Sequence, residues 1–238
     1  MRNTLAISWK EIRAYFTSPM AYIIAAVFVA LTSYFFVADI SSTPFPQAAI
    51  SGYTIPITSI LIFLAPVMTM RLLSEEQKLG TLELLLTAPI RDWEVVLGKF
   101  LASLAFLLSA LALTLYYVVL IYFFGDPDSG IIFSGYLGLI FYGATALSVG
   151  LLTSSFTSNQ IVAAVVGFSI LLLLTVTDLA ANVVSGPVAT FLRQLSLTAH
   201  FDDFSRGVID VGNVVYYVSV ILVFLFLTIR SLETRRWR

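Results

Sequence analysis

Cysteine is absent from the 238 residues, histidine occurs once, and Asp, Glu, Lys and Arg together make up only 11% of the chain. Without cysteine the chain forms neither disulfides nor thiolate metal sites, and the redox compartment stays undetermined. Thirteen basic and fourteen acidic residues are too few to cover the surface of a soluble domain of this length. The shortage of charge therefore excludes an ordinary soluble protein.

Hydrophobic residues fill the chain instead, at 59% of positions and a mean hydropathy of +0.95. Soluble domains contain about 45–50% apolar residues, and a helix needs about 20 apolar residues to cross a bilayer. We therefore predict an all-α polytopic membrane protein, a single domain over residues 1–238. The apolar stretch over residues 95–124 is long enough to combine an entry helix with a span. The predicted spans are residues 20–37, 53–70, 95–124, 131–152, 161–177 and 213–229.

Basic residues decide the expected orientation, because Lys and Arg near the ends of spans are retained in the cytoplasm. The segments expected on the outer side hold only Arg193 and Arg206. Both termini and the 71–94 segment are therefore predicted to be cytoplasmic. The eleven basic residues on that side are Arg2, Lys10, Arg13, Arg71, Lys78, Arg91, Lys99, Arg230, Arg235, Arg236 and Arg238.

The centres of the predicted spans contain no ionisable residue, although ion-coupled transporters and pumps place such residues at membrane depth. Gly98-Lys99 lacks the upstream glycine and the following Ser or Thr of a P-loop, and no G-x-S-x-G occurs. The single histidine, His200, falls in the outer segment and is expected to be a hydrogen-bonded residue. We predict no catalytic, metal or cofactor site and no nucleic-acid partner. Because the centres of the spans lack charged residues, energy for any transport is expected to come from outside them.

Residues 1–18 have the pattern of an amphipathic helix that lies along the membrane surface. Its apolar residues are Leu5, Trp9, Ile12 and Phe16, and its polar residues include Asn3, Ser8, Lys10, Glu11 and Arg13. Two readings stay open, a plain membrane anchor and a helix whose polar face receives a partner.

The 71–94 segment concentrates charge, leucine and helix-terminating residues. Ser74 and Gln77 fit a capping box for a first helix, and Gly80 breaks it. Thr81 can cap a short helix over 82–88, which Pro89 ends, and Asp92 can cap a third helix. The short helix either packs on its own spans or docks on another protein. The candidate docking residues are Glu75, Glu76, Gly80, Thr81, Leu82, Glu83, Leu84, Leu85, Leu86, Thr87 and Pro89, with Trp9, Lys10, Glu11 and Arg13 from the first helix.

The run EEQKLGTLELLLTAPIRDWEVVLGK resembles the signature of ABC-2 type export permeases, the membrane subunits of ATP-binding-cassette transporters. The family pattern is similar to E-x-x-x-G-T-x-x-x-L-x-T-x-P followed by G-K at the head of span 3. WKEIRAYFTSPMAYI and HFDDFSRGVID also resemble the gliding-motility subgroup of these permeases. The resemblance covers essentially the whole chain. The matching residues are Glu76, Gly80, Thr81, Leu85, Thr87, Pro89, Gly98 and Lys99.

The resemblance implies that the short helix is a coupling helix seated in a groove of a separate ATPase. It further implies two such ATPase subunits that bind ATP and Mg, a second permease copy, and a place for an auxiliary extracytoplasmic subunit. Residues 178–212 would form an outer re-entrant segment, with a break at Gly186-Pro187 and an apolar face of Phe191, Leu192, Leu195 and Leu197.

The expected function is therefore export across a prokaryotic cell membrane, with the lipid bilayer itself as a further partner. A force- or signal-transmitting role without a solute is the alternative.

Overall fold

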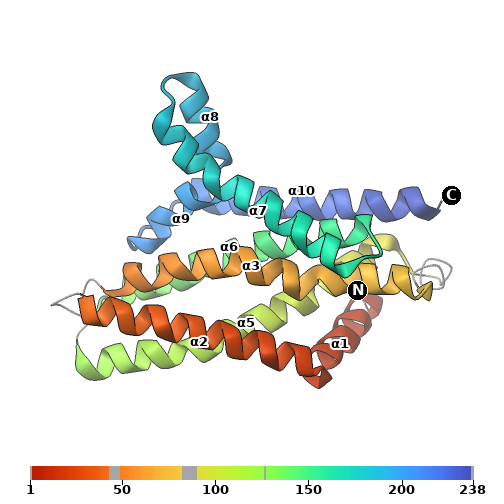
Figure 1. Ribbon diagram of the computed structural model, residues 1–238, viewed down its shortest axis with the longest axis horizontal. Coiled ribbons are helices and arrows are strands. Elements are labelled where there is room, and N and C mark those ends of the chain that lie inside the picture. The colour runs from red at the N-terminus through yellow and green to blue at the C-terminus, as the bar shows by residue number, and fades with distance from the viewer. Residues whose placement is uncertain (1, 43–48, 82–89, 126, 237–238) are drawn as a thin grey trace.

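The computed structural model describes residues 2–42, 49–81, 90–125 and 127–236 (Figure 1). Within these ranges the chain folds into nine helices and no strand, which confirms the predicted all-α class. The helices are α1 (Arg2–Thr17), α2 (Pro19–Ser42), α3 (Ala49–Lys78), α5 (Asp92–Phe124), α6 (Ser129–Phe156), α7 (Gln160–Val183), α8 (Pro187–Leu195), α9 (Leu197–Ser205) and α10 (Val211–Arg236).

Six of the described helices, α2, α3, α5, α6, α7 and α10, are long and apolar enough to cross a membrane, as the sequence predicts. Among them, α6 is the central helix, because 83% of its most apolar window is buried against 22% in α2, α7 and α10. Glycines allow neighbouring helices to approach it closely. A side chain at Gly143 would collide with Leu107 of α5, and one at Gly150 would collide with Thr69 of α3.

Helix α3 continues to Lys78, so the predicted helix start at Ser74 is wrong. The Ser74 hydroxyl donates to the Met70 carbonyl within the same helix instead of capping a new one. Ser154 of α6 also donates to Met70 O (2.9 Å) and accepts from the backbone N–H of Ser74 (3.0 Å). Contacts with α6 therefore keep this turn helical. The predicted break at Gly80 is confirmed, since its φ of +69° is a left-handed conformation that favours glycine.

Helix α5 is one continuous helix of 33 residues, not an entry helix followed by a separate span. Asp92 is its first residue and does not act as the predicted cap. The Glu94 carboxylate instead accepts the backbone N–H of Arg91 (3.1 Å), because Glu94 occupies the third helical position, from which a side chain reaches back to the cap.

The segment after α7 breaks at Gly186 (φ +84°), as the resemblance implies, and α8 begins at Pro187. Figure 1 shows α8 and the end of α7 projecting from the bundle, while α9 returns to it. Phe191, Leu192 and Leu195 lie together in α8, but the predicted apolar face does not extend to Leu197, because Ser196 caps a new helix by accepting the Ala199 N–H (3.2 Å). Leu197 is then buried in α9, whereas Phe191 of α8 is exposed.

His200 of α9 is hydrogen-bonded, as expected. Its Nδ1 lies 2.8 Å from Ser196 O, and its ring stacks on Tyr216 with 3.8 Å between centroids.

Candidate functional site at the charged end of the bundle

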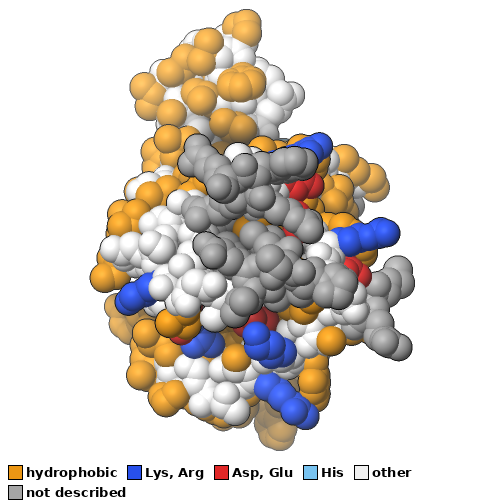
Figure 2. Space-filling view, turned by 90° about the vertical axis from the view of Figure 1, so that its right-hand side faces the viewer, with side chains coloured by type: hydrophobic (Ala, Val, Ile, Leu, Met, Phe, Trp, Pro, Cys, Tyr) orange, Lys and Arg blue, Asp and Glu red, His pale blue; other side chains and the backbone are white. Residues whose placement is uncertain are grey.

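Helix α1, the end of α3 and the C-terminal end of α10 lie at the same end of the bundle, together with the start of α5 (Figure 1). We call this the charged end. Figure 2 looks onto it and shows Lys and Arg side chains spread over the face with acidic side chains beside them. The opposite end carries α8 and α9.

Lys99 is the centre of an ion-pair cluster that joins three helices. Its Nζ lies 2.9 Å from Glu11 Oε1 of α1 and 2.8 Å from Glu76 Oε1 of α3. The lysine side chain is only 1% exposed, and the two glutamates are 14% and 17% exposed. A lone buried ammonium group would be strongly unfavourable, and the two carboxylates compensate for the burial of Lys99.

The residue before Lys99 lets α1 approach α5. A Cβ on Gly98 would lie 2.8 Å from Ile7 Cγ2 and 3.2 Å from Thr4 O, so only glycine fits without displacing α1. Ser8 uses this proximity to donate its hydroxyl to Gly98 O (3.0 Å). Both residues of the Gly98-Lys99 pair therefore hold α1 against α5. The glycine leaves room for α1, and the lysine forms an ion pair with it.

A second connection joins α1, the start of α2 and α3. The Arg71 guanidinium lies 4.8 Å from the centre of the Tyr15 ring, and its Nη1 donates to Ser18 Oγ (3.1 Å). Tyr15 in turn donates its hydroxyl to Met68 O (2.6 Å). Burial raises the pKa of Tyr15 well above its ordinary value, although Arg71 opposes the shift, so the hydroxyl stays protonated as a donor.

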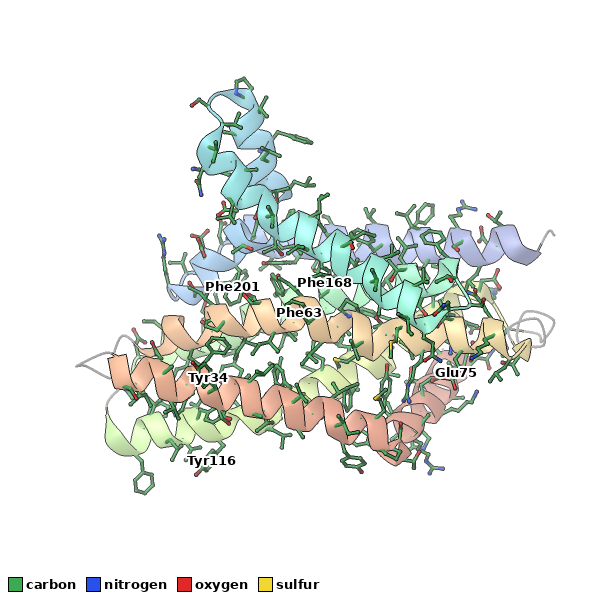
Figure 3. The ribbon with its side chains drawn as sticks, viewed as in Figure 1. Tyr34, Phe63, Glu75, Tyr116, Phe168 and Phe201 are labelled. Carbon is green, nitrogen blue, oxygen red and sulfur yellow. The ribbon has the colours of Figure 1, made fainter. Side chains whose placement is uncertain are left out.

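A cavity of about 520 Å³ lies beside the Lys99 cluster. Figure 3 labels Glu75 on the last turns of α3, between α1 and the start of α7. Within the described residues, Glu76 Oε2 is buried without a hydrogen-bond partner. The charged residues that line the cavity are Lys10, Glu11, Arg71, Glu75, Glu76 and Lys99.

The structure brings only part of the predicted docking set together. Glu76 and Glu11 meet at Lys99, while Glu75, Thr81 and Lys10 line the neighbouring cavity. The remaining predicted residues of the short helix lie outside the described residues, namely Leu82, Glu83, Leu84, Leu85, Leu86, Thr87 and Pro89.

In α1 the expected assignment of faces is partly wrong. Ser8 and Glu11, expected on the outward polar face, contact α5, because their side chains find partners at Gly98 and Lys99. Trp9 is 58% exposed and carries the Arg13 guanidinium over its ring at 5.3 Å. The exposed Trp9 agrees with a helix that rests on a membrane surface.

Sequence reasoning missed the role of Lys99 as the common partner of two glutamates. The sequence does contain a signal for this role. Lys99 lies at the edge of a long apolar stretch, and two earlier segments contain the acidic residues Glu11 and Glu76. Its partners could not be chosen from the sequence, since eleven basic and several acidic residues are expected on this side of the membrane.

In the described residues the site consists of ion pairs and hydrogen bonds that connect helices. Among the described ranges, no group of three or more His, Asp or Glu side chains is placed to hold a metal ion. The Lys99 cluster and the Arg71–Tyr15 contact instead fix α1 to the ends of α3 and α5.

Comparison with known proteins gives two results. The model of a family described as "ABC-2 family transporter protein" matches residues 5–237. The "Probable multidrug ABC transporter permease YbhR" of Escherichia coli K12, and its counterpart in strain O157:H7, are each 27% identical over 117 residues. The alignment covers 48% of this chain and 31% of each relative, so the chain spans less than a third of their length in this match. These comparisons give no support to the gliding-motility subgroup.

Proposed function

Because the chain belongs to the ABC-2 family of transporter proteins, we propose that it is a permease subunit that exports a solute using ATP hydrolysed by a separate ATPase. One observation supports this most directly. Glu76 and Lys99, from the two parts of the family-like motif, are in contact at 2.8 Å. The motif thus connects the segment after α3 to the start of a candidate span.

In this proposal residues 82–88 form the coupling helix that docks on the ATPase, and Pro89 ends it. Force applied there reaches Glu76, then Lys99 of α5 and Glu11 of α1. The buried and unpaired Glu76 Oε2 beside the 520 Å³ cavity leaves an acceptor for a donor from the ATPase.

The complete assembly would contain two permease copies, two ATPase subunits and a place for an auxiliary extracytoplasmic subunit. ATP and Mg would bind to the ATPase. The charged end would face the cytoplasm, because Lys and Arg gather there, and the assembly would sit in a prokaryotic cell membrane. The description of these relatives as probable multidrug permeases suggests drug-like molecules as the cargo class to test first.

A force- or signal-transmitting subunit that moves no solute would use the same ATPase contact. Stimulation of ATP hydrolysis by a defined solute, in membranes holding both subunits, supports export and contradicts the alternative.

Co-purification with an ATP-binding-cassette ATPase tests the docking part. Changing Leu84 and Leu85 to Asp should abolish recovery of the ATPase, because two carboxylates cannot enter an apolar groove, while the chain still inserts in the membrane. Val208 and Ile209, exposed at the opposite end, provide a matched double substitution to Asp that should leave recovery unchanged. Unchanged ATPase recovery with the Leu84 and Leu85 variant would place docking elsewhere.

A further inference from the structure

A smaller cavity of about 190 Å³ lies where α1 ends and α2, α3 and α7 come together. Met20, Ile24 and Val67 give it an apolar wall. The other side of the cavity is polar and is lined by Arg71, Glu75 and Gln160. A cavity with one apolar and one charged side suits an amphiphile better than a fully polar or fully apolar ligand.

The position of this cavity along the candidate spans corresponds to the headgroup level of a bilayer. Met20 and Ile24 lie in the first turns of α2, and Gln160 is the first residue of α7. Arg71 is the first charged residue after the apolar part of α3. Since three spans change from apolar to polar at the same level, lipid headgroups reach the cavity on this side of the membrane.

Arg71 is held in place before any ligand arrives. Ser18 fixes one end of its guanidinium by a 3.1 Å hydrogen bond, and the Tyr15 ring supports it at 4.8 Å. An arginine has five N–H donors, and Ser18 is the hydrogen-bond partner found for it among the described residues. The remaining donors suit a phosphate group, which a guanidinium recognises in bidentate fashion.

Glu75 adds a charge of the opposite sign to the same cavity. It follows Arg71 by one helical turn, yet the described residues contain no ion pair between the two. Glu75 is also exposed, so a ligand can reach it. A cavity that presents a guanidinium and a carboxylate, each unpaired with the other, matches a ligand that carries both a negative and a positive group.

We propose that this cavity binds the headgroup of an aminophospholipid of the phosphatidylethanolamine class. The phosphate contacts Arg71 and Gln160, the ammonium group donates to Glu75, and the acyl chains run out along Met20 and Ile24. The cavity is smaller than the roughly 300–1,000 Å³ pockets that enclose whole ligands, so it encloses the headgroup and leaves the chains in the bilayer.

The same chemistry disfavours the other common headgroups. A quaternary choline has no N–H to donate to Glu75, and an anionic phosphatidylglycerol places a net negative charge next to that carboxylate. The site should therefore prefer phosphatidylethanolamine to both. The lipid preference can be measured without an ATPase. A failure of the lipid proposal would therefore leave the proposed transport function untouched, and a failure of the transport proposal would leave the lipid proposal untouched.

The test uses the purified full chain, delipidated and then supplied with phosphatidylethanolamine, phosphatidylcholine or phosphatidylglycerol of identical acyl chains. Bound lipid is counted by native mass spectrometry, and thermal unfolding is followed in parallel. We expect phosphatidylethanolamine to be retained most and to raise the unfolding temperature most. Soluble phosphoethanolamine should give no shift, because it lacks the chains that contact the apolar wall.

Two variants test the contributions of the two charged residues one at a time. Arg71→Gln should weaken phosphatidylethanolamine binding about tenfold, as expected for the loss of one charge-assisted contact. Glu75→Gln, at an exposed position, should keep the fold, reduce the preference over phosphatidylcholine and increase binding of phosphatidylglycerol. Arg230→Gln, an exposed arginine at the same end but outside the cavity, is the matched control and should bind like the unaltered chain.

Three outcomes would overturn the proposal. The first is equal retention of the three lipids by the unaltered chain. The second is a Glu75→Gln variant whose lipid preference is unchanged. The third is binding of soluble phosphoethanolamine as tight as that of the lipid, which would identify a headgroup-sized soluble ligand instead.

Discussion

Lys99 is buried near the apolar part of α5, where it is neutralised by carboxylates from two other helices. The arrangement is asymmetric, because one lysine serves Glu11 and Glu76. Loss of either glutamate leaves a one-to-one ion pair. Loss of the lysine leaves two partly buried carboxylates without the cation that they share, which is the worse electrostatic state.

Lys99→Met should therefore lower the free energy of unfolding by about 3–5 kcal/mol, and Glu11→Gln by about 1.5 kcal/mol. Adding Glu11→Gln and Glu76→Gln to Lys99→Met should recover part of the loss, since the repelling charges are then gone. Thermal unfolding in one detergent measures all three variants. A Lys99→Met variant as stable as Glu11→Gln would contradict the ion-pair assignment.

At the scale of the element, α1 lies on α5 because Gly98 leaves room for it. Thr4 and Ser8 are buried on this face, whereas Leu5 and Trp9 are exposed on the other. The helix therefore contacts protein on one side and presents large apolar side chains on the other, which is how an interfacial helix joins a bilayer to a bundle.

Gly98→Ala should displace α1, because its Cβ would lie 2.8 Å from Ile7 and overpacking of this kind costs about 1–3 kcal/mol. The natural absence of cysteine allows a direct measurement. A single Thr4→Cys, buried on the face of α1 that packs against α5, should react slowly with a maleimide and faster when Gly98→Ala is added.

Gly212→Ala is the control for this measurement, because its added Cβ makes only ordinary contacts of 3.5 Å or more. It should leave the labelling rate of Thr4→Cys unchanged. Equal labelling with and without Gly98→Ala would show that α1 does not depend on the glycine.

At the scale of the whole molecule, the charged end and the α8–α9 end are chemically different. Both ends of the chain lie near the charged end in Figure 1, as six spans require. The excess of Lys and Arg there predicts that this end faces the cytoplasm.

Cysteine labelling in intact cells tests this orientation. Lys78→Cys lies at the charged end, and Val188→Cys lies on exposed α8 at the opposite end. A membrane-impermeant maleimide should label Val188→Cys in intact cells and Lys78→Cys only after permeabilisation, with no signal from the cysteine-free chain. The reverse pattern would place the charged end outside and remove the basis for ATPase docking there.

Helix boundaries could be predicted from the sequence where they depend on the residues of one short segment. The break at Gly80 and the start of α8 at Pro187 follow from the backbone preferences of these residues, and the structure shows both. The helix start at Ser74 failed for a different reason. Its capping pattern is real in the sequence, but Ser154 of α6 binds the same turn and keeps it helical.

The sequence by itself determined the class of the protein, because six long apolar stretches and scarce charge permit no other solution than a helical bundle in a membrane. Only the tertiary structure decided which charges pair. Glu11 and Lys99 are separated by 88 positions, and many acidic residues compete for the same lysine in sequence. Their pairing depends on how closely α1 approaches Gly98, and distance in space, which a sequence does not contain, sets the strength of an ion pair.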